Sequence, residues 1–206
     1  MRAMATAVMA IDPENPDAET LARGAAVLRA GGLVAFPTET FYGLGAAARD
    51  AAAVRRVFRV KGRTASKPLL VLVDSVAMAE GLAMEIPSRA RELMARHWPG
   101  ALTLVLRAGP DLPVELTAGT GTIGVRLSPH AVCRGLVRAL GTPVTAPSAN
   151  RESGAPPTEA GEVLGVFDGA IDLLLDGGAT AGGPASTVVD VTGDAPRVLR
   201  QGAVTV

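Results

Sequence analysis

The sequence has 206 residues, with 20 acidic and 20 basic side chains, and 48% of its residues are hydrophobic. These values exclude wholesale disorder and a globally basic nucleic-acid binder. One cysteine, Cys133, and two histidines exclude an intrachain disulfide and an ordinary structural zinc site. No apolar run approaches the ~18 residues that a membrane span requires. We expect a cytoplasmic protein without a membrane segment.

Strand and helix patterns alternate along the whole chain. Residues 3–11 predict a first strand, although the methionines near the start leave open whether residues 1–10 are a flexible or misassigned start. The segment Asn15-Pro16-Asp17 predicts a helix start. Further helices are expected at residues 50–60, 87–97 and 129–140, and strands at residues 33–36, 69–73, 101–106, 122–127, 144–145, 171–175, 187–191 and 197–199.

Residues 38–45 (TETFYGLG) predict a polar loop that contains glycine. The mixed order of the elements indicates an α/β or α+β protein built around a large sheet. Because no repeat, low-complexity tract or long linker interrupts the pattern, we expect one domain over residues 1–206.

Lysine usage marks the first candidate site. Both lysines of the chain, against 18 arginines, lie in the heptapeptide KGRTASK of residues 61–67. Lys61, Arg63 and Lys67 follow a predicted helix in a turn, where Gly62 lets a bulky anion approach the backbone. An ammonium group and a planar guanidinium together suit a polyphosphate. The alternative, a solvated basic surface, fits the arginines of the preceding helix better.

The segment APSAN of residues 146–150 is a second candidate. Proline, serine and asparagine are ordinary turn residues, so a plain turn is the first interpretation. A nucleophilic Ser148 is disfavoured because no Gly-x-Ser-x-Gly elbow surrounds it and no base is evident. The hydroxyl of Ser148 and the amide of Asn150 fit ligand binding better.

Two further segments place polar groups beside apolar strands. Thr38, Glu39 and Tyr42 follow a predicted strand, where hydroxyls suit a small polar ligand and the acid suits an ammonium group; a capped turn is an equal alternative. Arg126 falls in an otherwise apolar strand. Its guanidinium therefore needs a fixed anionic partner, either internal or a ligand.

Six segments occur together in the order GGLVAFPTETFYGLG, KGRTASKPLLVLV, WPGALTLVL, GTIGVRLSPH, PVTAPSANRESG, and STVVDV with VLRQG. In this combination the chain resembles the YrdC-like threonylcarbamoyl-adenylate synthases from residue 31 to about residue 203. The resemblance implies a twisted, open mixed sheet flanked by helices, with a concave, positively charged cleft. It also explains how a nucleotide could be bound although neither a Walker-type phosphate loop nor a dinucleotide-binding glycine motif is present.

The resemblance implies a reaction. L-threonine and bicarbonate or CO2 would form a carbamate that attacks the α-phosphate of ATP, giving threonylcarbamoyl-AMP and pyrophosphate. The product would serve threonylcarbamoyl-adenosine modification of tRNA, with a separate tRNA threonylcarbamoyl transferase acting downstream. Mg²⁺ would arrive with ATP and be held mainly by phosphates, with no metal site on the protein.

The resemblance also assigns roles to individual residues. Lys61 and Arg63 would carry catalysis by holding phosphates, and the nucleotide would also be bound by Ser148, Asn150 and Arg200. The threonine or carbamate side would be lined by Thr38, Tyr42, Lys67, Thr122, Arg126 and Ser186.

Three departures from the family pattern are visible. Leu72 stands where many relatives carry histidine, and Gln201 stands where a proline is frequent. The sequence ends at residue 206, before an additional domain that longer relatives carry, so we expect the short form of the family.

Three other functions are compatible with parts of the sequence. A double-stranded RNA or tRNA-binding module would use the seven basic residues of the segment 49–67, and weak RNA binding would also accompany an enzyme. A related carbamoyl-transfer enzyme would share the domain, and a purely structural α/β protein would bind no nucleotide.

Overall fold

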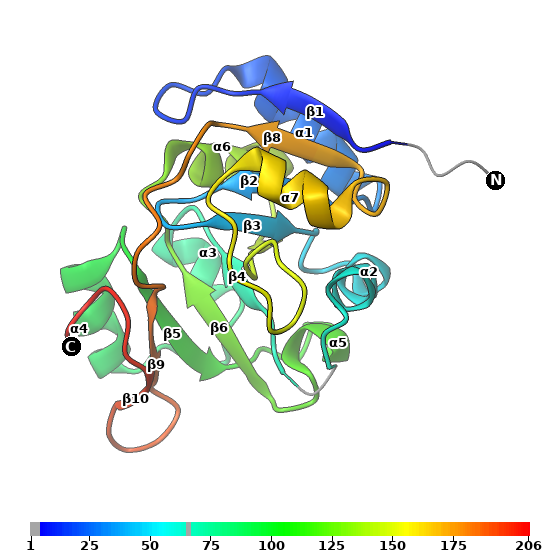
Figure 1. Ribbon diagram of the computed structural model, residues 1–206. Helices are drawn as coiled ribbons and strands as arrows, with labels where there is room; N and C mark the ends of the chain where they lie inside the picture. The colour runs from blue at the N-terminus through cyan, green and yellow to red at the C-terminus, as the bar shows by residue number, and fades with distance from the viewer. Residues whose placement is uncertain (1–4, 65–66) are drawn as a thin grey trace.

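The computed structural model describes residues 5–64 and 67–206, and its strands form two sheets (Figure 1). The four-stranded sheet has the order β1 (Ala7–Ala10), β8 (Leu173–Asp176), β2 (Val34–Pro37) and β3 (Tyr42–Gly45). The six-stranded sheet has the order β10 (Arg197–Arg200), β9 (Thr187–Asp190), β5 (Leu102–Arg107), β6 (Thr122–Arg126), β4 (Leu70–Leu72) and β7 (Val144–Thr145). Both sheets mix parallel and antiparallel pairs, so the α/β class is confirmed, but two sheets replace the single large one that the sequence predicts.

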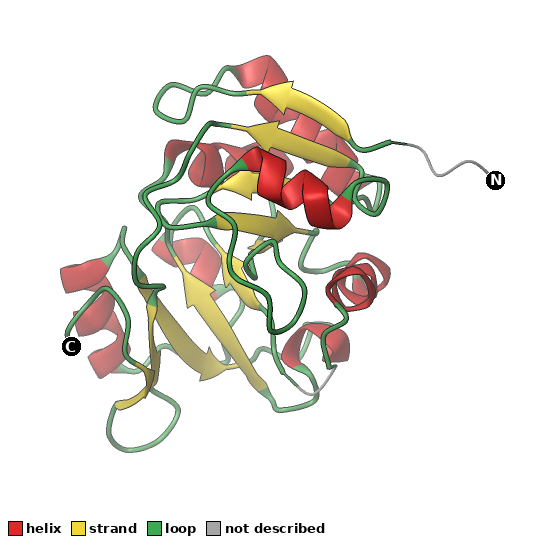
Figure 2. Ribbon diagram, in the orientation of Figure 1, coloured by secondary structure: helices red, strands yellow, loops and turns green. Residues whose placement is uncertain are grey.

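Helices cover both faces of the four-stranded sheet. The seven helices of the described residues are α1 (Ala18–Arg29), α2 (Ala51–Lys61), α3 (Val76–Glu80), α4 (Ser88–His97), α5 (Val114–Thr117), α6 (Ala131–Leu140) and α7 (Ala160–Phe167), of which α1, α6 and α7 contact the four-stranded sheet. Helices α1 and α6 pack on each other behind this sheet, and α7 lies in front of it (Figure 2). Within the described ranges, no helix has the length and apolar character needed to cross a bilayer.

Capping residues set the helix boundaries. The Asp17 carboxylate accepts a hydrogen bond from the Thr20 amide (2.8 Å), so α1 begins at Ala18, after the predicted Asn15-Pro16 start. The Asp50 carboxylate caps α2 in the same way, and Gly62 ends that helix in the left-handed conformation (φ 61°). Lys61 therefore becomes the last residue of α2 rather than part of a free loop.

The prediction of a polar loop at residues 38–45 is wrong in its second half. Tyr42–Gly45 forms β3, which pairs antiparallel with β2 as one arm of a hairpin. Its residues are buried, and pairing with β2 outweighs the weak local strand preference of two glycines. The sequence also did not predict the short helices α3, α5 and α7. Of the predicted first strand, residues 7–10 form β1, while residues 3 and 4 lie outside the described residues.

Side-chain alternation gives the six-stranded sheet two different faces. On β5, Leu102, Leu104 and Leu106 are buried in the main core, and on β6 the same core receives Ile123 and Val125. The residues between them point to the opposite face, because successive strand side chains alternate. That second face is where polar groups collect.

Strand β7 joins the two sheets. The Thr145 amide donates to Ala46 O (3.0 Å), while the Thr145 hydroxyl accepts from Ala46 N (2.9 Å) and donates to Leu44 O (3.2 Å). Just beyond β7, the Leu44 amide donates to Pro147 O (2.8 Å). The hairpin of β2 and β3 is thereby fixed beside the second face of the six-stranded sheet.

Candidate functional site

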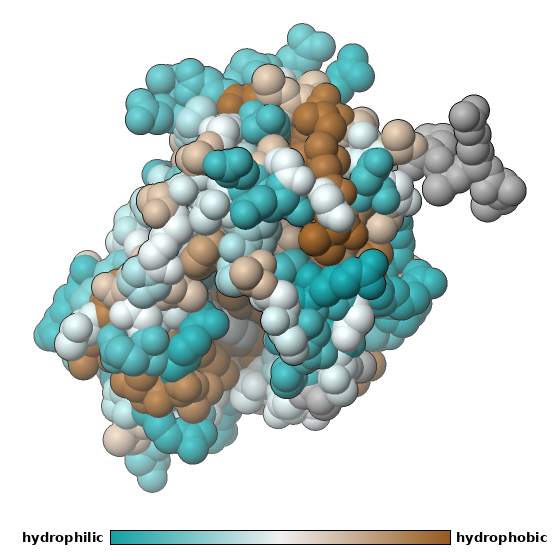
Figure 3. All heavy atoms as spheres, viewed as in Figure 1, coloured by the Kyte–Doolittle hydropathy of each residue, from teal (hydrophilic) through white to brown (hydrophobic). Residues whose placement is uncertain are grey.

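A pocket of about 540 Å³ lies on this second face of the six-stranded sheet. Its floor comes from five strands, with alternate residues on β4, β5 and β6: Leu70, Leu72, Thr103, Val105, Thr122, Gly124, Arg126, Val188, Leu199 and Arg200. Its rim comes from the hairpin and the segment after β7: Thr38, Thr40, Phe41, Tyr42, Gly43, Ala146, Pro147 and Ser148. Figure 3 shows the surface hollowed between these parts of the molecule.

Three arginines line the pocket: Arg63, Arg126 and Arg200. Within the described part of the chain, no aspartate or glutamate lines it. Burial lowers the pKa of the Arg63 guanidinium. Burial and, after it, the like charge of Arg126 lower the pKa of Arg200, so these two cations lie close to each other. A pocket with this lining favours an anionic ligand.

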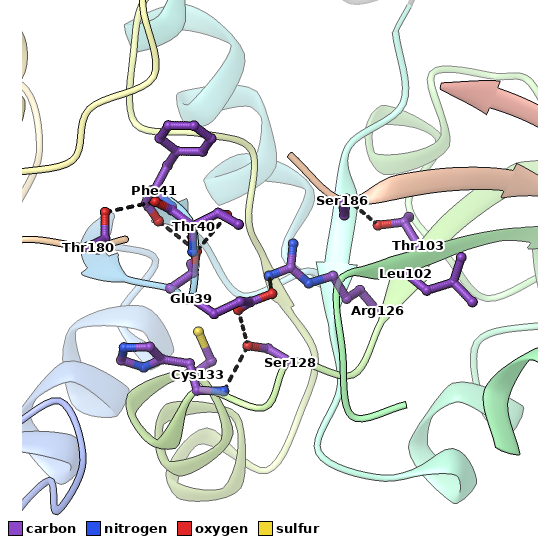
Figure 4. A network of polar contacts seen from close by, with 12 residues as sticks. Glu39, Thr40, Phe41, Leu102, Thr103, Arg126, Ser128, Cys133, Thr180 and Ser186 are labelled. Carbon is purple, nitrogen blue, oxygen red and sulfur yellow. Dashed lines mark hydrogen bonds and ion pairs between the residues drawn. The ribbon is translucent and has the colours of Figure 1, made fainter. Parts of the chain in front are cut away.

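Arg126 is buried at the end of β6 and has an internal partner, as one of the two sequence-based alternatives requires. Its Nη2 donates to Glu39 Oε1, and the Ser128 hydroxyl donates to Glu39 Oε2 (2.6 Å; Figure 4). Both carboxylate oxygens of Glu39 are thus engaged, which replaces the interpretation that this acid receives an ammonium group from a ligand.

Arg200 is held by Ser186. Its Nε and Nη2 donate to Ser186 O (3.1 and 2.9 Å), and Nη2 also lies 3.2 Å from Ser186 Oγ. Ser186 Oγ is in turn 2.9 Å from Thr103 Oγ1. Thr103, which the sequence did not single out, therefore belongs to the pocket as a support of Ser186.

Lys61 lies beneath the pocket rim rather than in the lining. It is 3% exposed, and its Nζ donates to the carbonyl oxygens of Ser148 and Asn150. Burial, followed by the nearby charge of Arg63, lowers its pKa from 10.5 to about 8. In this arrangement the ammonium group holds the segment that carries Ser148, and the predicted role on phosphates remains a prediction.

Ser148 and Asn150 differ in their relation to the pocket. Ser148 lines it, and its hydroxyl donates to Asn150 Oδ1. Asn150 does not line it. Its Nδ2 donates within the loop to Gly154 O (2.6 Å) and Arg151 O (2.9 Å). The amide side chain of Asn150 orders the loop in this structure.

Lys67 also lies outside the pocket lining. Its Nζ is 2.8 Å from Glu152 Oε1, and Glu152 Oε2 accepts from the Thr64 amide (3.1 Å). The hydrogen bond from Lys67 and then the one from Thr64 lower the pKa of the Glu152 carboxyl. Glu152, absent from the sequence-based candidates, joins the basic segment to the loop after Ser148. Residues 65 and 66 of the basic segment lie outside the described residues.

Thr38, Tyr42 and Thr122 line the pocket, and the hydroxyl of each already has a partner within the protein. Thr38 Oγ1 donates to Phe41 O (2.7 Å), and Thr122 Oγ1 lies 2.9 Å from another threonine hydroxyl. The Tyr42 hydroxyl donates to Gly178 O (2.7 Å), and burial raises its pKa to about 12. Thr38 and Thr122 can exchange these partners for a ligand, whereas the Tyr42 hydroxyl is fixed in the protein interior.

Two other residues, His130 and Cys133, are engaged in the structure of the protein. His130 Nδ1 accepts from the Val132 amide (3.3 Å) at the start of α6, and burial lowers the pKa of the imidazole. Cys133 is buried, which raises the pKa of its thiol to about 12. The Cys133 thiol is therefore not available as a nucleophile at neutral pH.

A family model named for Sua5, YciO and YrdC, with the description "Telomere recombination", matches residues 26–202. The chain belongs to the Sua5/YciO/YrdC family. A solved structure of E. coli YciO, 25% identical, superposes with a TM-score of 0.88 and covers 96% of each chain, so the implied α/β fold with helices flanking mixed sheets is confirmed.

Relatives within the Sua5/YciO/YrdC family carry names that bear on function. The chain is 43% identical over 186 residues to a threonylcarbamoyl-AMP synthase of Bacillus subtilis, covering 90% of this chain and 54% of the relative. It is 39% identical over 193 residues to a putative threonylcarbamoyl-AMP synthase of Mycobacterium tuberculosis, covering 94% and 88%.

A solved structure of P. abyssi Sua5 complexed with L-threonine superposes with a TM-score of 0.92 at 42% identity. The superposition covers 96% of this chain and 58% of that chain. The chain thus spans little more than half the length of the Bacillus and Pyrococcus relatives.

Proposed function

We propose that this protein is an L-threonylcarbamoyladenylate synthase, which converts L-threonine, bicarbonate or CO2, and ATP into threonylcarbamoyl-AMP and pyrophosphate. The single observation that carries the proposal is the pocket lined by three guanidinium groups and by no carboxylate among the described residues. Membership of the family and the names of its relatives support the same reaction. The product would serve tRNA modification through a separate transferase.

The reaction requires positioning and charge neutralisation more than a protein nucleophile. The amine of threonine adds to CO2 and loses a proton, which gives a carbamate. A carbamate oxygen then attacks the α-phosphorus of ATP, and the bond from that phosphorus to the bridging oxygen breaks as pyrophosphate leaves. Arg63 and Arg200 have no acidic partner in the pocket, so they suit the charge of the phosphates.

Arg126 suits the carboxylate or carbamate of the amino-acid substrate, because its guanidinium has a fixed position and lines the floor. The small hydroxyls of Thr38 and Thr122 lie on the rim and floor of the same pocket. We assign to them hydrogen bonds with the same substrate. The floor also contains Leu70 and Leu72, which offer apolar surface to the methyl group that separates threonine from serine.

Mg²⁺ enters the proposal only as a companion of ATP. The described residues contain no group of three or more His, Cys, Asp or Glu side chains that could hold a metal ion. The donor set of the pocket therefore does not fit a protein-held metal, and the triphosphate and water would supply the ligands.

The basic segment argues against an RNA-binding module as the main function. Arg55 pairs with Glu115, Arg56 pairs with Asp172 (2.9 Å), and Lys67 pairs with Glu152. Internal partners thus already compensate several of the charges that a phosphate backbone would need. A flat dependence of RNA affinity on salt concentration would exclude the backbone-contact mode altogether.

Pyrophosphate release from ATP tests the proposal. We expect release that requires both L-threonine and bicarbonate, and a product of the mass of threonylcarbamoyl-AMP. Release with carbamoyl phosphate in place of these two substrates would instead indicate a carbamoyl-transfer enzyme. Binding of ATP without any release would reject the synthase function of the chain acting alone.

A further inference from the structure

Glu39 connects the two sheets at the pocket. It lies in the turn between β2 and β3, whereas Arg126 ends β6 and Ser128 follows two residues later. Its carboxylate lies between these two side chains (Figure 4). One acid therefore fixes the hairpin that forms the rim against the strand that forms the floor.

The surroundings of Arg126 make this contact necessary. The guanidinium is buried, its Nε has no hydrogen-bond partner among the described residues, and Glu39 is its ion-pair partner. A buried cation that loses its counter-ion carries a large desolvation penalty. Arg126 lies close enough to Arg200 that its charge helps to lower the pKa of Arg200. Without its counter-ion, Arg126 would therefore also be repelled by Arg200.

The geometry of the contact leaves part of Arg126 free. A guanidinium has five N–H donors, and Glu39 accepts from Nη2. Arg126 lines the pocket while Glu39 does not. Of the other nitrogens of Arg126, Nε is buried, so Nη1 is the group left for an anion in the pocket.

We propose that Glu39 is a positioning residue that orients Arg126 and the turn of residues 38–41 for the anionic end of the amino-acid substrate. Its effect on turnover rests on the proposed function, whereas its effect on Arg126 does not. Glu39 is not itself catalytic, because both its oxygens have protein partners and it does not face the pocket.

Glu39→Gln tests the proposal, because it keeps the shape of the side chain and removes the charge. The matched control is Glu115→Gln. Glu115 also pairs with an arginine, Arg55, and its side chain is 25% exposed against 20% for Glu39, but it lies outside the pocket. Both variants lose one ion pair, but the side chain of Arg55 is 55% exposed and that of Arg126 is 7% exposed, so a difference between the variants reports on the buried pair at the pocket rather than on ion pairing as such.

The first measurement is ¹⁵N NMR of the ligand-free protein, with the Arg126 signals assigned by their loss in Arg126→Lys. In the wild type and in Glu115→Gln we expect separate Nη signals, because a fixed ion pair slows rotation about the Cζ–Nη bonds. In Glu39→Gln we expect these signals to merge. Free rotation of Arg126 in the wild type would overturn the proposal, whether or not the protein is a synthase.

The second measurement is steady-state kinetics of pyrophosphate release. We expect Glu39→Gln to raise the KM for L-threonine by about tenfold, the effect of losing ~1.4 kcal/mol of binding, with kcat within about threefold of the wild type. If Glu39 only stabilised the fold, Glu39→Gln would lower the melting temperature and leave this KM unchanged. That result would overturn the proposal. If Glu39→Gln does not fold, Ser128→Ala removes one of the two Glu39 contacts and should raise the same KM by about threefold.

A double-mutant cycle with Arg126→Lys shows whether Glu39 acts through Arg126. If it does, the KM of the double variant equals that of Arg126→Lys alone within about twofold. If the KM of the double variant instead rises by the product of the two single effects, a positioning role of Glu39 through Arg126 is rejected. Absence of turnover in the wild type would reject the proposed function only, since the NMR result decides the positioning of Arg126 independently.

Discussion

The buried amine of Lys61 leads to a quantitative prediction about stability and pH. Lys61 ends α2 and is 3% exposed, and burial is the main cause that lowers its pKa from 10.5 to about 8. Below pH 8 the folded and unfolded states both carry the ammonium, so the folded state bears the full cost of burying it. Between pH 8 and 10.5 only the folded state releases the proton. Stability must therefore rise with pH across this window.

The difference between 10.5 and about 8 corresponds to about 3 kcal/mol below pH 8. About 2 kcal/mol of this penalty disappears between roughly pH 7.5 and 9.5. These values are upper limits, because the carbonyl oxygens of Ser148 and Asn150 favour the ammonium and oppose desolvation. The neutral amine still has two N–H donors for the two carbonyls, so deprotonation leaves the loop held.

Urea denaturation of the wild type and Lys61→Met at about pH 7.5 and 9.5 tests this reasoning. We expect the free energy of unfolding of the wild type to gain up to about 2 kcal/mol relative to the variant at the higher pH. The titrations of Cys133 and Tyr42 occur in both proteins and cancel. The control is Lys67→Met, whose lysine is 62% exposed and whose difference from the wild type should not change with pH. A Lys61→Met difference equally constant with pH would refute the desolvation of Lys61.

Three further predictions address the site, the thiol and the packing of the sheets. Arg63→Ala should lower the turnover number about 10²–10³-fold, as loss of a charge-stabilising donor does. Arg23→Ala, on the exposed face of α1, should leave the turnover number unchanged in the same pyrophosphate assay. Equal effects of the two substitutions would contradict the placement of the pocket. Cys133 should not react with a thiol reagent at pH 8 until the protein is unfolded, because the thiol is buried and its pKa is raised to about 12; rapid reaction of the native protein would show that α6 opens. Gly45→Ala should lower the free energy of unfolding by about 1–3 kcal/mol, since its Cβ would come within 2.7 Å of Phe36 Cε1, and an unchanged urea midpoint would show that β2 and β3 can separate locally.

The local pattern of the sequence predicts the elements whose period is strong. The helices at residues 50–60, 87–97 and 129–140 and the strands of the six-stranded sheet all occur within a few residues of their predicted bounds. Strand β3 was missed because its pairing with β2, rather than its own composition, makes it a strand. The division of the strands into two sheets depends on contacts between distant segments and has no local signal.

The pocket was predicted better than the contacts within it. The segments of the family pattern supply most of the predicted site residues to one pocket, but Glu39 and Arg126 are 87 residues apart, and so are Lys61 and Ser148. No local pattern contains such pairings. A signal for the burial of Lys61 was nevertheless present, because it follows Val57 by four residues on the apolar face of α2.

The division of the pocket between two sheets has a consequence for how a ligand and the fold depend on each other. A ligand that contacts both the floor on β6 and the rim on β3 adds a third connection beside Thr145 and Glu39. Ligand binding then slows amide hydrogen exchange in β3 and β6 together, by an amount that follows the ligand concentration. Substitutions of the residues that connect the sheets, Thr145 and Glu39, change ligand affinity without contacting the ligand, because they change the width of the pocket between floor and rim.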